Sequence, residues 1–118
     1  MIWIILDREE YLDDLLSALI ELEITGAAIL DGVGMERVLA TDVPIFAGLI
    51  QSLSGSRPYN KNILAVVKDR TTISDLLDLL KEIGIDFREP STGRLFALPI
   101  GLSVSAEGTW DISPDPKA

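Results

Sequence analysis

The chain has 118 residues, of which 47% are hydrophobic, and its 19 acidic and 10 basic residues give a net charge of −9. It contains no cysteine and no histidine, which excludes disulfides, zinc–thiolate and imidazole metal sites, cysteine nucleophiles and every triad built on a histidine base. The negative charge also disfavours binding to nucleic acid or anionic lipid.

A single globular domain is predicted over residues 1–118, because a chain of this length and hydrophobic content can bury a core without disulfides or metal. We divide it into a core over residues 1–101 and a C-terminal tail over residues 102–118. The start, MIWIILDREE, lacks the cationic and long apolar segments of a signal peptide, and no apolar run approaches the length of a membrane helix. We therefore expect a cytoplasmic protein without membrane insertion.

The first part of the chain predicts a strand, a helix and a second strand. Ile2–Leu6 is a short apolar run typical of a buried strand. Asp7 follows as the expected N-cap of a helix over residues 8–24, with Glu10 in the position of a capping box. Gly26 is expected to end that helix in the left-handed conformation. The second predicted strand contains AAIL and ends at residues 31–32.

A second unit of the same kind begins with a strand over Asn62–Val67. Thr72 is the expected N-cap of the next helix, with Asp75 at its third position. Gly84 ends this helix, and Ile85 is placed to contact Leu80 as in a Schellman motif. The residues expected to face inward are Leu76, Leu77, Leu80 and Ile83.

The fourth predicted strand covers residues 94–100 and contains Pro99, which has no backbone donor, so the strand should lie at an edge or end there. Two strand–helix–strand units favour an α+β, ferredoxin-like βαββαβ fold, a four-stranded antiparallel sheet with both helices on one face. The strands are apolar nearly throughout, so the other face also needs cover. We expect a homo-oligomer that packs sheet on sheet; the tail over residues 102–118 is the alternative cover.

The connection Gly32–Asn62 is far longer than the usual connection of about four to six residues, which suggests a functional segment. Residues 42–53 predict an extra helix inserted between strands two and three, with Asp42 as its cap and Pro44 in its first turn. Its apolar face packs in the core or at a subunit interface, or else forms a groove for a partner protein. That face consists of Ile45, Phe46, Leu49, Ile50 and Leu53.

The cations lie unevenly along the chain, because residues 1–42 carry a net charge of −8 and residues 43–118 only −1. An anion site is therefore expected in the second part. The return segment SGSRPYNK combines small residues with Arg57 and Lys61 and could form a backbone nest for an anion. The alternative is an ordinary turn into the third strand, with Arg57 paired to a carboxylate.

Three short segments carry a family resemblance: Gly32-Val33-Gly34, the return RPYNKNILAVV and the motif TGRLFALPI over Thr92–Ile100. They are similar to the Gly-Phe-Gly, the proline-led re-entry and the DGKIFVLPV of P-II-type nitrogen signal-transduction proteins. The chain resembles a divergent member of that family, since Met35-Glu36-Arg37 stands where the family has an Arg-Gln-Lys run.

The resemblance implies a ferredoxin-like subunit in a homotrimer whose sheets face inward. It further implies nucleotide phosphates bound in clefts between subunits, near Gly93 and Arg94, and a long loop that starts at Gly34 and contacts target proteins. Together with the cations of the connection, this gives the candidate ligand-binding residues Gly34, Arg37, Arg57, Lys61, Gly93 and Arg94.

These features favour a non-enzymatic regulatory protein, a trimer that binds a small anionic effector, a nucleotide being one candidate, and acts on a partner protein. No catalytic residue is expected, because the acidic helix faces offer no pocket in which paired carboxylates could acquire different pKa values. A metal site is disfavoured by the absence of histidine and cysteine, and no cofactor is expected. The alternative is a structural or protein-interaction oligomer without a small-molecule ligand.

Overall fold

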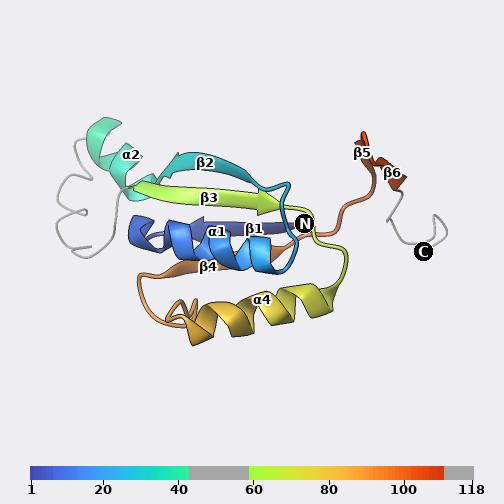
Figure 1. The fold of residues 1–118 in the computed structure, drawn as a ribbon. Helices are drawn as coiled ribbons and strands as arrows, with labels where there is room; N and C mark the ends of the chain where they lie inside the picture. Colours follow the sequence, from blue (N-terminus) through green and yellow to red (C-terminus); the bar gives the residue numbers. More distant parts are fainter. Residues whose placement is uncertain (43–58, 111–118) are drawn as a thin grey trace.

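A four-stranded antiparallel sheet organises the computed structural model, which describes residues 1–42 and 59–110 (Figure 1). Its strand order is β2–β3–β1–β4, and helices α1 and α4 lie together on one face. The protein is therefore a mixed α+β domain. The elements are β1 (Ile2–Leu6), a 3-10 turn (Glu9–Tyr11), α1 (Leu12–Glu21), β2 (Ala28–Val33), α2 (Met35–Asp42), β3 (Tyr59–Ala65), α4 (Arg70–Glu82), β4 (Gly93–Ala97), β5 (Ser103–Ser105) and β6 (Gly108–Trp110).

The core lies between the two helices and one face of the sheet. Alternate residues of the central strand β1 point into it, because successive side chains of a strand point to opposite faces. Ile4 stands opposite Ile63 of β3 and Leu95 of β4, so one apolar layer crosses three strands. The fully buried side chains are Ile2, Ile4, Leu6, Leu15, Leu19, Ile63, Leu76, Leu80 and Ile85.

The opposite face of the sheet carries large apolar side chains that the helices do not cover. Trp3 stands opposite Phe96, and their ring centroids are 6.4 Å apart. Phe96 is 43% exposed. We call this surface the open face; its exposed apolar members are Trp3, Leu30, Val66, Phe96 and Leu98.

The first helix begins later than expected, and Asp7 is not its cap. The backbone N–H of Asp7 donates to Thr92 O at 3.0 Å, and Arg8 stays extended. The chain is thus held beside β4 for one more residue, and a 3-10 turn precedes α1. Tyr11 occupies the N-cap position of α1 without a side-chain capping bond.

The same helix also ends earlier than expected, at a residue other than glycine. Glu23 has φ 62°, and its N–H donates to Ile20 O at 2.9 Å. The N–H of Ile24 donates to Leu19 O at 2.8 Å, which completes a Schellman pair of bonds. The prediction that Gly26 ends the helix is therefore wrong. Ile24 is buried beside the core, and this burial fixes the end of α1 at Glu21.

Replacing Glu23 with glycine should raise the free energy of unfolding by about 0.5–1 kcal/mol, because glycine adopts this left-handed backbone without a Cβ penalty. Denaturant unfolding measures the change. Glu21→Gly is the matched control inside α1, where the same substitution should lower stability by about 1 kcal/mol. Equal losses in both variants would contradict the assignment of Glu23 as the helix stop.

Helix α4 ends as predicted but begins elsewhere. Gly84 has φ 94°, and the N–H of Ile85 donates to Leu80 O at 2.8 Å, which confirms the Schellman motif. The N-cap is Asp69, not Thr72. Asp69 Oδ1 accepts from Thr72 N at 2.8 Å and from Thr72 Oγ1 at 2.9 Å. These bonds lower the pKa of Asp69, and the bond from the Thr72 backbone N–H is the larger cause.

The inward face of α4 is narrower than expected. Leu76 and Leu80 are fully buried, whereas Leu77 is 37% and Ile83 46% exposed. The prediction that all four leucine and isoleucine positions face inward is therefore wrong for these two. The reason is geometric: α1 and the sheet cover only one stripe of α4.

The connection after β2 starts with a helix rather than with an irregular exit from the sheet. The N–H groups of Arg37 and Val38 donate to Gly34 O, so α2 begins directly after the glycine. Asp42, the expected cap of a later helix, belongs to α2. The predicted helix over 42–53, its apolar face (Ile45, Phe46, Leu49, Ile50 and Leu53) and Arg57 otherwise lie outside the described residues.

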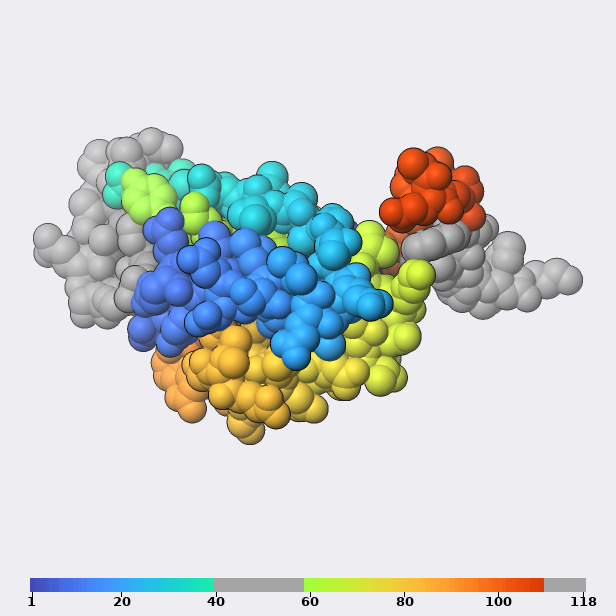
Figure 2. Space-filling model, viewed as in Figure 1, coloured from blue at the N-terminus to red at the C-terminus, as the bar shows by residue number. Residues whose placement is uncertain are grey.

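Strand β4 ends before Pro99 and lies at the edge of the sheet, as its proline predicted. The tail then forms the β5–β6 hairpin, with Val104 opposite Thr109. The hairpin stands apart from the sheet and helices (Figure 2). Residues 103–105 and 108–110 thus do not cover the open face, which was the alternative expected for the tail.

Candidate functional site

Several of the predicted site residues meet at one end of the sheet. Lys61 pairs with Leu6 of β1 and with Asp31 of β2, and Leu6 pairs with Gly93 of β4. A single row therefore crosses all four strands. Beside it lies a cavity of about 420 Å³, whose wall includes Val33 and Tyr59 in addition to the Asp31–Lys61 pair.

Lys61 is the central charge of this cavity, and two carboxylates hold it. Its Nζ lies 2.5 Å from Asp31 Oδ1 and 3.5 Å from Glu9 Oε1. The hydrogen bond to Asp31 is the main cause that raises the pKa of Lys61 above its ordinary value. The lysine side chain is largely covered while both carboxylates are exposed. The two carboxylates offset the charge of the ammonium, so an incoming anion would compete with them.

Arg37 and Tyr59 form the other half of the site. The Arg37 guanidinium lies 5.0 Å from the centroid of the Tyr59 ring, a cation–π arrangement. α2 supplies the arginine and the first residue of β3 supplies the tyrosine, so the contact joins the two ends of the long connection. Among the described side chains of residues 1–39 and 59–109, no carboxylate forms a salt bridge with Arg37. Its charge can serve an incoming anion.

Arg94 lies on the other side of the sheet from this cavity. It stands opposite Ile5, whereas Gly93 stands opposite Leu6, and neighbouring residues of a strand face opposite ways. Arg94 therefore shares the open face with Asn62, which also stands opposite Ile5. Thus Lys61 and Gly93 lie on the helix side at one end of the sheet, and Gly34 and Arg37 follow β2 at the same end. Arg94 lies on the open face, and Arg57 lies outside the described residues.

A polar chain on the open face escaped the sequence interpretation. Trp3 Nε1 donates to Asn62 Oδ1 at 2.8 Å, and Asn62 Nδ2 donates to Asn60 Oδ1 at 2.7 Å. The two amides lie over Gly32, where a Cβ would meet Asn60 Oδ1 at 2.1 Å. The signal was present in the sequence: asparagine at alternate positions of a strand must share one face. Glu9 gave no such signal, because its approach to Lys61 depends on the late start of α1.

The Lys61 cluster predicts a measurable titration. The pKa of Lys61 should lie above 10.5 in the native protein and fall toward that value in Asp31→Asn, because the principal bond to the ammonium is lost. Since the folded-state pKa is the raised one, the cluster stabilises the fold below pH 10.5 and this contribution disappears as the pH rises through the raised pKa. NMR of the Nζ resonance measures both proteins; Glu9→Gln, at the longer distance, should change the pKa less.

The described parts of the chain contain no cluster of three carboxylates able to hold a metal ion. Over the same residues, no helix is long and apolar enough to cross a bilayer. A scan against protein-family models and a search of curated proteins found no match to the chain.

Proposed function

We propose that this protein is a non-enzymatic, P-II-like regulatory oligomer that binds a small anionic effector beside the base of its long connection and acts on a partner protein. The fold we propose is ferredoxin-like βαββαβ. Two observations support it: the strand order β2–β3–β1–β4 and the position of α1 and α4 on one face of the sheet.

The observation that carries the effector proposal is the meeting of a cavity with both ends of the connection. Gly34 and Arg37 lie at its start and Tyr59 lies at its return. The 420 Å³ cavity is lined by Val33, next to Gly34, and by Tyr59, which contacts Arg37. This volume is within the range of pockets for small ligands. An anion bound to Arg37 would compete with the Tyr59 contact and shift α2 relative to β3. Such a shift changes the surface that a partner protein meets.

The oligomer proposal rests on the open face. Packing of Trp3, Phe96 and their neighbours against a second copy would remove apolar surface from water at about 25 cal/mol per Å². The P-II resemblance makes the assembly a trimer. Arg94 would then lie at the edge of a subunit interface, on the same end of the sheet as Gly93.

A second candidate function is a structural or interaction oligomer without an effector. One observation favours it: Asp31 and Glu9 already compensate the charge of Lys61. In that protein the Arg37–Tyr59 contact would hold the connection in one place permanently.

Solution mass tests the assembly. The wild type should sediment at three times the 12.9 kDa chain mass. Phe96→Lys should sediment as a monomer, because a buried unpaired charge on the open face costs more than the contact supplies. Ile20→Lys is the matched control, since Ile20 is 66% exposed on α1, in the helix layer. A monomeric wild type would contradict the oligomer proposal.

Calorimetry and hydrogen exchange separate the two candidate functions. Wild-type protein is titrated with adenine nucleotides and inorganic phosphate, beside Arg37→Ala and Arg94→Ala. The regulatory proposal expects binding that Arg37→Ala weakens and that Arg94→Ala, on the other face of the sheet, leaves unchanged, with exchange protection over residues 35–60 gained on adding ligand. Strong protection without ligand, together with no binding of any anion, would contradict the regulatory proposal and support the structural oligomer.

A further inference from the structure

A second cavity lies at the opposite end of the sheet from Lys61 and Asp31. There β3 and β4 both end opposite Ile2, the first residue of β1, and the chain runs on beyond each of them. Met1 and Leu98 exchange two backbone bonds of 2.7 Å at this end of the sheet. The notch between residues 66–70 and 97–100 has a volume of about 710 Å³. That size suits a small ligand.

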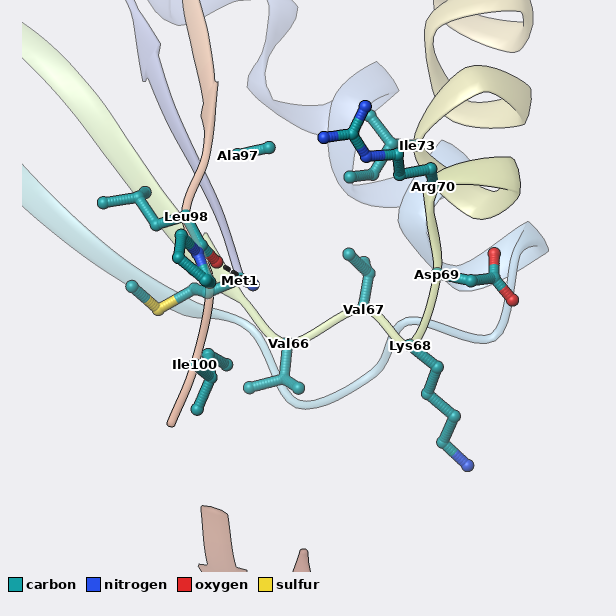
Figure 3. Close-up of a pocket in the computed structure, with 11 residues that line it drawn as sticks. Met1, Val66, Val67, Lys68, Asp69, Arg70, Ile73, Ala97, Leu98 and Ile100 are labelled. Atoms are coloured by element: carbon teal, nitrogen blue, oxygen red, sulfur yellow. Dashed lines mark hydrogen bonds between the residues drawn. The ribbon is translucent and has the colours of Figure 1, made fainter. Parts of the chain in front are cut away.

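The notch is lined mainly by apolar side chains, and its charged groups are the Met1 α-ammonium, which donates to Leu98 O, and the side chains of Lys68, Asp69 and Arg70. Val67, Ile73 and Ala97 form the helix side of its wall, and Leu98 and Ile100 form the opposite side. Figure 3 shows the Arg70 guanidinium turned toward Ala97, whereas the Lys68 ammonium and the Asp69 carboxylate point away. Asp69 is moreover occupied as the cap of α4 through its bonds to Thr72.

We propose that this notch binds a small apolar carboxylate, with its hydrocarbon part against Ile73 and Leu98 and its carboxylate on Arg70. Charge complementarity selects this ligand class. Within the described residues Arg70 has no carboxylate partner, and a guanidinium pairs with a carboxylate through two parallel hydrogen bonds. The apolar walls reject a strongly hydrated polar ligand, because they offer its polar groups no partners.

The site is independent of the proposed effector site. Arg37 lies beyond the end of β2 and Lys61 lies near the start of β3, whereas Arg70 follows the end of β3. Variants at either end should therefore leave binding at the other end unchanged.

The experiment titrates the full chain with hexanoate and, in parallel, with hexanamide, which has the same hydrocarbon part without the charge. Amide resonances of residues 66–73 and 97–100 should shift with hexanoate. Hexanamide should bind at least about tenfold more weakly, because the charge-assisted bonds are lost. Equal binding of the two compounds, or no shift with hexanoate, would overturn the proposal.

Two substitutions locate the site. Arg70→Gln should weaken hexanoate binding at least about tenfold while leaving hexanamide unchanged. Arg88→Gln, an exposed arginine after α4, is the matched control and should alter neither. Ala97→Phe should abolish binding of both compounds, because the ring fills the notch; Ala97 is exposed, so the core stays intact. Hexanoate binding that persists unchanged in Arg70→Gln or in Ala97→Phe would overturn the assignment.

Discussion

Replacing Gly93 with alanine is expected to lower the free energy of unfolding by about 2–4 kcal/mol, from backbone strain together with overpacking. Gly93 has φ 146°, a conformation that residues with a Cβ rarely adopt. An alanine Cβ would also lie 2.2 Å from Ile5 O, a backbone atom of the central strand. Strand β4 would have to move away from β1. Chemical denaturation at one fixed protein concentration measures the loss.

Two other glycines provide graded controls for that measurement. Gly84→Ala meets no atom within 4 Å but retains the strain of φ 94°, so it should cost about 1 kcal/mol. Gly26→Ala has neither strain nor a close contact and should be nearly neutral. If Gly93→Ala were as mild as Gly26→Ala, the tight β1–β4 contact would be refuted. The ranking of the three stability losses also matters for binding experiments. If Gly93→Ala lost ligand binding, the displaced strand β4 would be the cause.

Replacing Leu80 with alanine should cost about 2–5 kcal/mol, since the side chain is fully buried between α1, α4 and the sheet and its loss leaves a cavity. Leu77→Ala is the same substitution one turn away on α4. Leu77 is 37% exposed, so about 1 kcal/mol or less is expected there. Urea unfolding with an unchanged m-value measures both. Comparable losses at the two positions would contradict the packing of α4.

The order of the four sheet strands and of α1 and α4 could be predicted because each of these elements has its own local signal; α2 and the β5–β6 hairpin were not predicted. Ile2–Leu6 is a short apolar run typical of a buried strand, and Gly84 followed by Ile85 carries the complete Schellman signature. The residue at which each helix begins was harder to predict, for a physical reason. The segment DRTTIS offers Asp69 and Thr72 as possible caps, and the choice depends on where β3 releases the chain. Glu23 was unpredictable because tertiary burial of Ile24, not glycine, fixes the stop.

The site could be predicted only in part, because its geometry depends on strand register. Lys61 and Asp31 meet through the β2–β3 pairing, and the long connection between those strands hides the register from local patterns. By contrast, the sequence alone shows which residues of one strand share a face, because successive side chains point to opposite faces. Gly93 and Arg94 are neighbours in one strand and must face opposite ways, so a motif that contains both does not place both beside one ligand.

The bond between Trp3 and Asn62 also gives the protein an internal optical probe. The indole is fixed on the open face by the 2.8 Å hydrogen bond, yet 37% of the residue is exposed. Its fluorescence therefore responds to whether water reaches that face. The chain has two tryptophans, so Trp110→Phe leaves Trp3 as the single emitter. Emission of that variant should move to longer wavelength as an assembly is diluted into single chains, and a dilution series would follow association without any attached label.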